Sequence, residues 1–161
     1  MRRHISEKRE MLRQFTASIA YHGTKAIRDA PAMYPEFNLG GGARTPRQIL
    51  HHITGVLTYA HSFFEDYETT NLDHQEWDTE INCFYEILAK LDNSLKEKGP
   101  RTVTEEQLLQ GPLSDAMAHI GQLLMLRRLA GNPIPSENFI FADIAKGRVG
   151  PDQSEPVAPD E

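Results

Sequence analysis

Apolar residues recur every three or four positions along four long stretches of the chain. This spacing places them on one side of an α-helix, and no segment shows the sustained apolar and polar alternation of a strand. The predicted helices cover residues 6–29, 46–67, 73–98 and 113–130. Because each helix has one stripe to bury, the pattern predicts an all-α protein built as a four-helix bundle.

Capping residues set the expected ends of these helices. Thr45 followed by Pro46 is typical of a helix start, and Asp73 followed three residues later by Glu76 resembles a capping box. Gly131 is placed to end the last helix. Residues 104–110 are expected to form one or two short turns, which Gly111 and Pro112 break.

The residues after the bundle divide into two parts. Residues 137–146 predict a short C-terminal helix that ends at Gly147. From Pro151 onward the chain is rich in proline and acidic residues, which is typical of disorder. We therefore expect a single domain over residues 1–150 and a disordered tail over residues 151–161.

The composition narrows the class of protein. The chain of 161 residues has a net charge of −6 and no long basic run, so we expect neither nucleic acid nor an anionic membrane as partner. No apolar segment has the length of a membrane span. The lone Cys83 excludes an intramolecular disulfide, and its burial as a small apolar side chain is favoured over a nucleophilic role. Together these features favour a cytoplasmic protein.

Three polar residues fall on or beside the predicted inner faces of two helices. His52 flanks the apolar stripe of the second helix, and Asp115 and His119 lie one turn apart on the fourth. Two imidazoles and one carboxylate form a three-ligand metal site with open positions, as in catalytic zinc sites, and the same ligands suit nickel, iron or manganese. Each residue taken singly also has a structural interpretation, as a hydrogen-bonded histidine or a first-turn acid.

Other polar residues have weaker claims to a function. His22 lies near the apolar stripe of the first helix and is a rival or additional site residue, whereas His4, His51, His61 and His74 are expected to face solvent. The loop at residues 40–42 has three consecutive glycines and precedes Arg44 at a helix start, so it could bind an anion. The alternative, a flexible connection between helices, is favoured because the phosphate-loop spacing is missing.

Two segments of the chain resemble the DinB-like superfamily of metal-binding four-helix bundles. They are TPRQILHHITGVLTYAHSFF in the second helix and LSDAMAHIGQLLMLRRLAG in the fourth, and the similarity continues from about Arg44 to Gln153. The resemblance implies one ligand at His52 and a second at His119, which precedes Ile-Gly-Gln. The middle ligand, usually a histidine, falls on Asp115. The resemblance also implies that the site binds a divalent metal, such as nickel or zinc.

Two functions remain open from the sequence. The first, which the resemblance to the DinB-like superfamily implies, is a metal-dependent enzyme of the thiol transferase or hydrolase class that acts on a small molecule and, as a transferase, uses a low-molecular-weight thiol. Gln122 would orient a ligand or the substrate, with Leu126 and Phe63 lining the site. The alternative is a non-catalytic homodimer, because Met117, Ile120 and Leu124 form a second apolar face on the fourth helix that something must cover.

Overall fold

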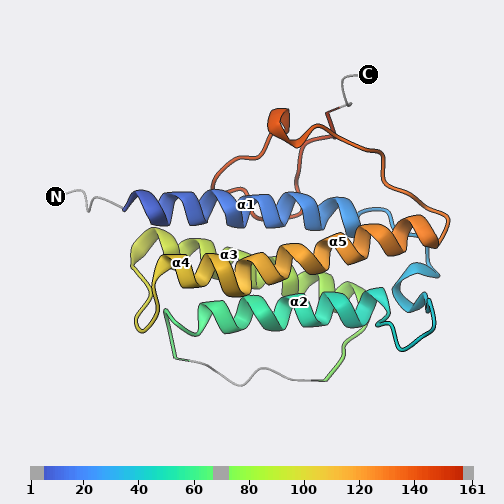
Figure 1. Cartoon of the computed structure of the whole chain (residues 1–161), viewed down its shortest axis with the longest axis horizontal. Helices are drawn as coiled ribbons and strands as arrows, with labels where there is room; N and C mark the ends of the chain where they lie inside the picture. Colours follow the sequence, from blue (N-terminus) through green and yellow to red (C-terminus); the bar gives the residue numbers. More distant parts are fainter. Residues whose placement is uncertain (1–5, 67–72, 158–161) are drawn as a thin grey trace.

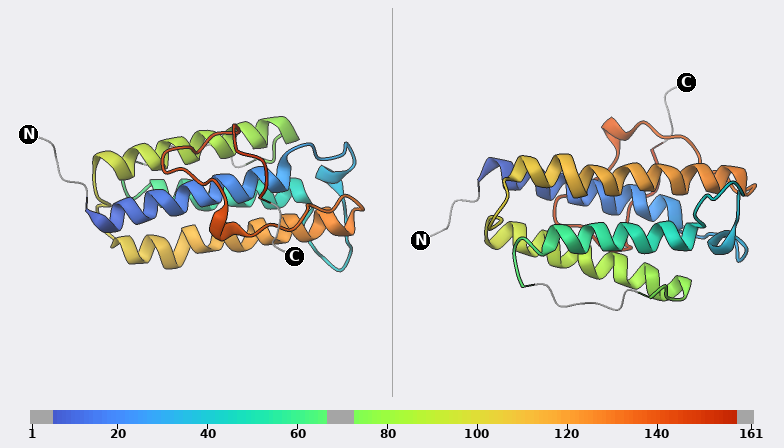
Figure 2. Two further views of the ribbon diagram at one scale, coloured as in Figure 1. Left: turned by 90° about the horizontal axis from the view of Figure 1, so that it is seen from above. Right: turned by 60° about the horizontal axis from the view of Figure 1, so that its bottom comes forward.

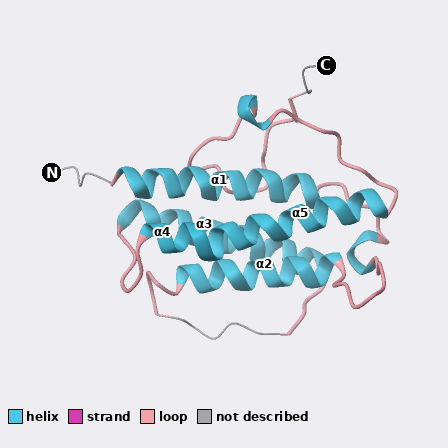
Figure 3. Ribbon diagram, in the orientation of Figure 1, coloured by secondary structure: helices cyan, strands magenta, loops and turns pink. Residues whose placement is uncertain are grey.

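Four long helices form the bundle in the part of the chain that the structure describes (Figure 1). The computed structural model describes residues 6–66 and 73–157, and within these ranges it contains helices, turns and loops but no strand (Figure 3). The long helices are α1 (Glu7–Ile27), α2 (Pro46–His61), α3 (Trp77–Glu97) and α5 (Ser114–Leu129). The predicted all-α helical bundle is confirmed. None of the described helices has both the length and the apolar character needed to cross a membrane.

Helices α1 and α5 run in one direction along the bundle, and α2 and α3 run in the other (Figure 1). Helix α1 packs against α3 and α5, and α2 packs against the same two helices. Because α2 and α3 run in the same direction, the end of α2 and the start of α3 lie at opposite ends of the bundle (Figures 1 and 2). The starts of α2 and α3 therefore lie side by side, together with the segments that precede them.

The predicted start of α2 agrees with the structure, and that of α3 does not. Thr45 caps α2 in both directions: its hydroxyl accepts from the backbone N–H of Gln48 at 3.3 Å, and its N–H donates to the Gln48 side chain at 2.9 Å. The expected start of α3 at Asp73 is wrong, because the helix begins at Trp77 after an extended Glu76 without a side-chain cap. The N–H of Gln75 instead donates to the Glu80 carboxylate at 2.7 Å, which holds this segment extended.

Two predicted helix ends also shift. Helix α2 ends at His61 rather than near Tyr67, which lies outside the described residues. The chain turns there because the carbonyl of Phe63 accepts from the N–H of Arg101 at 2.8 Å instead of continuing the helix. The short turns expected before the fourth helix are α4 (Glu105–Leu108) and the π-helical turn η2 (Leu109–Leu113). They join α5 through a kink at Gly111 rather than a break.

The inner face of α5 differs from the predicted one. Ala116, Ile120 and Leu123 have at most 1 % exposure and form its core contacts. The stripe that carries Asp115, His119 and Gln122 therefore lies on the flank of the helix rather than in the interior. Helix α5 is apolar nearly all round, so the spacing alone allowed either orientation. Because Ile120 is buried by the bundle itself, this second face needs no partner to cover it.

The C-terminal segment is not the predicted helix over residues 137–146. Only η3 (Phe139–Phe141) forms a single 3₁₀ turn, in which Ile140 is 81 % exposed. The segment is held instead by Glu137, whose buried carboxylate accepts from the Tyr21 hydroxyl, the Lys25 ammonium and the Val157 N–H. These bonds fix the backbone in an extended path over α1 (Figure 2).

The tail expected to be disordered is held against α1 as far as Val157. Arg28 donates to the carbonyl of Gln153 at 2.9 Å, and the Gln153 amide donates to the carbonyl of Gly150 at 2.8 Å. Gln153 is only 8 % exposed. Side-chain anchoring therefore offsets the unfavourable composition of this segment. Residues 158–161 of the predicted tail lie outside the described residues.

Candidate metal centre

The three residues singled out by spacing come together between α2 and α5. Asp115 Oδ1 lies 3.2 Å from His119 Nε2, and Asp115 Oδ2 lies 3.9 Å from His52 Nε2. The two imidazole rings stand nearly perpendicular, with centroids 4.5 Å apart. One ligand atom from each residue lies within 4.8 Å of the other two. Two nitrogens and one carboxylate oxygen are thus arranged to hold one metal ion.

The cluster lies at the surface of the bundle. The sequence had predicted that it would lie on or beside the inner faces of the two helices. The side chains of His52, Asp115 and His119 are 37 %, 50 % and 16 % exposed. An ion held here would have protein ligands on one side and solvent on the other. The remaining coordination positions would be open to water or to a small molecule, as in catalytic sites.

Gln122 determines which ring nitrogen of His119 carries the proton. Its side-chain oxygen lies 3.0 Å from His119 Nδ1, and an amide oxygen can only accept, so Nδ1 carries the proton. The lone pair of Nε2 then points toward Asp115 and is available to a metal. A histidine that donates its other N–H to a fixed oxygen is the usual support of a metal ligand. This is the position of an orienting group, one of the two roles predicted for Gln122.

His52 is held in the form that binds metals. Its partial burial lowers its pKa, and the nearby charge of Arg44 lowers it further. The imidazole is therefore neutral at neutral pH, with a lone pair free to coordinate. A metal does not have to displace a proton from this ligand.

A surface cavity of about 400 Å³ lies beside His52. The residues around it come from the glycine loop, the start of α2 and the segment before α3: Gly42, Ala43, Arg44, Gln48, His51, His52 and His74. All three loop glycines have positive φ, between 64° and 86°, which explains the glycine run. Leu126 and Phe63, expected to line the site, are not among these residues. Leu126 is 6 % exposed and belongs to the core.

The other candidates lie away from this cluster. His22 packs on the Phe139 ring, with centroids 4.2 Å apart, and does not join the metal ligands. Cys83 is half-buried in a groove of about 530 Å³ between α2 and α3, and burial raises the pKa of its thiol. A raised pKa makes it a poor nucleophile. His4 lies outside the described residues.

Two of the histidines expected to face solvent are in fact half-buried against α3. His61 Nε2 lies 3.1 Å from Ser94 Oγ, and His51 Nδ1 lies 2.8 Å from the buried carboxylate of Glu80. The exposed ring of His74 stacks on His51, with centroids 4.4 Å apart. The sequence analysis did not consider Glu80. It lies four residues before the buried Phe84 and so shares the apolar stripe of α3, where an acidic residue indicates a buried polar contact.

Comparison with known proteins identifies no relative. No protein-family model matches the chain, and neither the curated proteins nor the solved structures contain a match.

Proposed function

We propose that the protein is a divalent-metal-dependent enzyme, with His52, Asp115 and His119 as the ligands. The observation that carries the proposal is the approach of three donor atoms from two helices to within 4.8 Å at an open surface. Zinc and nickel suit this ligand set best, with iron and manganese as further candidates. The resemblance to the DinB-like superfamily adds support, with Asp115 in place of the usual histidine.

The chemistry follows from three ligands and open positions. Bound to such a site, a divalent metal lowers the pKa of a coordinated water or thiol and supplies a nucleophile at neutral pH. His52 and His119 contribute neutral nitrogens, and Asp115 contributes the one negative charge. Gln122 keeps His119 in the correct tautomer. The reaction class is then transfer to a thiol or hydrolysis of a small molecule that enters from the cavity beside His52.

Metal analysis of the full chain without a histidine tag tests the site. We expect His119→Ala and the isosteric Asp115→Asn each to lose one equivalent of bound Zn²⁺ or Ni²⁺ while the helix content by circular dichroism stays unchanged. His61→Ala is the matched control, because His61 lies on α2 outside this cluster. Equal metal content in the wild type and both site variants would overturn the proposal.

Cobalt substitution separates the thiol and water chemistries. If the open positions accept a thiol, 2-mercaptoethanol added to the Co²⁺ protein should produce an intense near-ultraviolet sulfur-to-cobalt band that His119→Ala abolishes. If the site serves hydrolysis, the thiol leaves the spectrum unchanged, and a Co²⁺ band should instead shift with pH as the bound water ionises.

A homodimer is the second candidate. The apolar face of α5 that first suggested it is covered by the bundle, but other apolar side chains are exposed. Met125 and Leu129 near the end of α5 are 57 % and 49 % exposed, and Phe141 of η3 is 65 % exposed. Large exposed apolar side chains are typical of interaction surfaces. Light scattering measures the mass directly, and a Met125→Lys/Leu129→Lys variant should convert a dimer to a monomer.

A further inference from the structure

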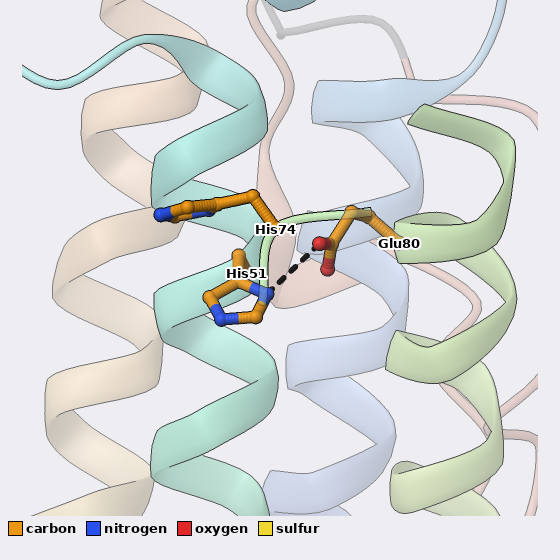
Figure 4. Close-up of side chains that lie close together, drawn as sticks. All are labelled: His51, His74 and Glu80. Atoms are coloured by element: carbon orange, nitrogen blue, oxygen red, sulfur yellow. Dashed lines mark hydrogen bonds and ion pairs between the residues drawn. The ribbon is translucent and has the colours of Figure 1, made fainter. Parts of the chain in front are cut away.

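We propose that His51, His74 and Glu80 form a second site for a divalent transition metal, separate from the first. One donor atom from each residue lies within 4.8 Å of the other two. The three side chains come from α2, from the segment before α3 and from α3 itself (Figure 4). Two imidazoles and one carboxylate favour Zn²⁺ among common cellular ions.

The His51 and Glu80 donors already lie near the separation of neighbouring ligands. His51 Nδ1 and Glu80 Oε1 are 2.8 Å apart. In a tetrahedral site, ligand bonds of about 2.0–2.2 Å place adjacent donors on one ion about 3.3–3.6 Å apart, only slightly more than this separation. An ion could therefore replace the hydrogen bond between them with little movement of α2 or α3.

The burial of Glu80 favours a cation at this point. Its side chain is only 2 % exposed, and its described partners are His51 and the N–H of Gln75. Among the described ion pairs, no lysine or arginine reaches this carboxylate, although the charge of Arg47 acts on it from beyond ion-pair distance. A buried carboxylate is costly unless positive charge is close. A divalent ion would supply that charge at the carboxylate itself, which the hydrogen bond with His51 does not.

His74 distinguishes a metal site from a simple histidine and carboxylate pair. The hydrogen bond from His51 to Glu80 is complete without His74, yet the exposed His74 ring lies against His51, and one of its nitrogens is within 4.8 Å of a donor atom of each group. His51 and His74 also border the cavity of about 400 Å³, which leaves room for solvent ligands. An ion here would tie the segment before α3 to α2.

The two sites use different sides of α2. His51 and His52 are consecutive, so their side chains point about 100° apart on the helix. His52 faces Asp115 on α5, and His51 faces Glu80 on α3. Loss of either site by mutation should therefore leave the ligands of the other in place.

Titration of the full untagged chain with Zn²⁺ against a chromophoric chelator tests the proposal. We expect two equivalents for the wild type and one for His74→Ala, which removes an exposed ring and so leaves the core intact. His119→Ala should also bind one equivalent, and the double variant none. Glu80→Gln serves as a second probe of this site, with circular dichroism to check folding, and His61→Ala as the histidine control.

The outcomes separate the two metal proposals. If His119→Ala abolishes all binding, or if His74→Ala and Glu80→Gln both bind as the wild type does, the second site is overturned and the pair is only a hydrogen bond. If His74→Ala loses an equivalent while His119→Ala loses none, the second site stands and the first fails. As a further check, Zn²⁺ should shift the imidazole ¹⁵N resonances of His51 and His74 in the His119→Ala protein.

Discussion

Gly23 on α1 lies directly against the ring of Phe84 on α3. A Cβ at position 23 would lie 2.6 Å from the ring's Cζ atom and 3.0 Å from Cε1. Phe84 is fully buried, so its ring has no room to retreat. The close approach of α1 and α3 therefore depends on the missing side chain at this position.

Gly23→Ala should destabilise the protein although alanine favours helix. The overpacking penalty is about 1–3 kcal/mol, which exceeds the gain in helix propensity of about 1 kcal/mol. Gly121→Ala on α5 is the matched control, because a Cβ at position 121 would meet nothing within 4 Å and the variant gains the propensity alone. Urea unfolding measures both changes, and a Gly23→Ala protein as stable as the control would contradict the prediction.

The Arg13 and Asp92 side chains join α1 to α3 with two hydrogen bonds, of 2.9 Å and 3.1 Å. Both are nearly buried, at 11 % and 10 % exposure. Arg13→Met should cost about 3 kcal/mol, because it leaves a buried carboxylate without its partner. The double variant Arg13→Met/Asp92→Leu should recover part of that loss. If the two single changes add in the double variant, the ion pair makes no contribution of its own.

The positions of the helices could be predicted from the sequence. The face that each helix buries could be predicted only for some of them. The stripes of α2 and α3 are strongly one-sided, so Ile53 and Leu88 lie in the core as the spacing indicates. Helix α5 is apolar nearly all round, and the inner face predicted for it is wrong. Local spacing still placed Asp115 and His119 side by side, because one turn of helix suffices for that.

The second cluster could not be assembled from the sequence. His51 and Glu80 meet because α2 and α3 run in the same direction, and helical spacing does not give the relative direction of two helices (Figure 1). Similarly, the extended C-terminal segment depends on the partners of Glu137 rather than on its own helix propensity. Both features come from contacts between residues that are distant in the chain, which override local preference.

Stability should fall below neutral pH partly because of His22. Burial lowers the pKa of His22, with the nearby Lys25 charge lowering it further, so the folded protein resists protonation. The unfolded chain takes up its proton first, near a pKa of about 6.5, so this contribution is complete above that pH and declines as the pH falls toward the folded pKa.

His22→Phe should reduce this pH dependence, because it keeps the ring against Phe139 but cannot titrate. The test is the difference in urea midpoint between about pH 7 and about pH 5. That difference should be smaller in the variant than in the wild type. An unchanged difference would show that His22 does not contribute.

Glu137 should control the attachment of the C-terminal segment. Burial of its carboxylate opposes ionisation, but the bonds from Lys25 and Tyr21 outweigh it and lower its pKa. Glu137→Ala leaves the buried Lys25 ammonium unpaired, which should cost on the order of 3 kcal/mol and speed proteolysis after α5. Glu137→Gln keeps one acceptor oxygen and so only part of these hydrogen bonds, and its cleavage rate should lie between those of the wild type and Glu137→Ala. Equal cleavage rates in all three proteins would exclude this anchoring role.

Gln122 offers a test of how the first metal site is supported. Its oxygen fixes the proton on Nδ1 of His119, so Gln122→Leu frees the ring to rotate and to change tautomer. Loss of such an orienting partner typically lowers metal affinity by about 10–100-fold. Gln122→Glu retains an acceptor at the same distance and should keep most of the affinity. Zn²⁺ competition titrations measure all three proteins in the His74→Ala background, so that only the first site is counted. If Gln122→Leu binds as tightly as Gln122→Glu, the hydrogen bond has no role in holding the ligand.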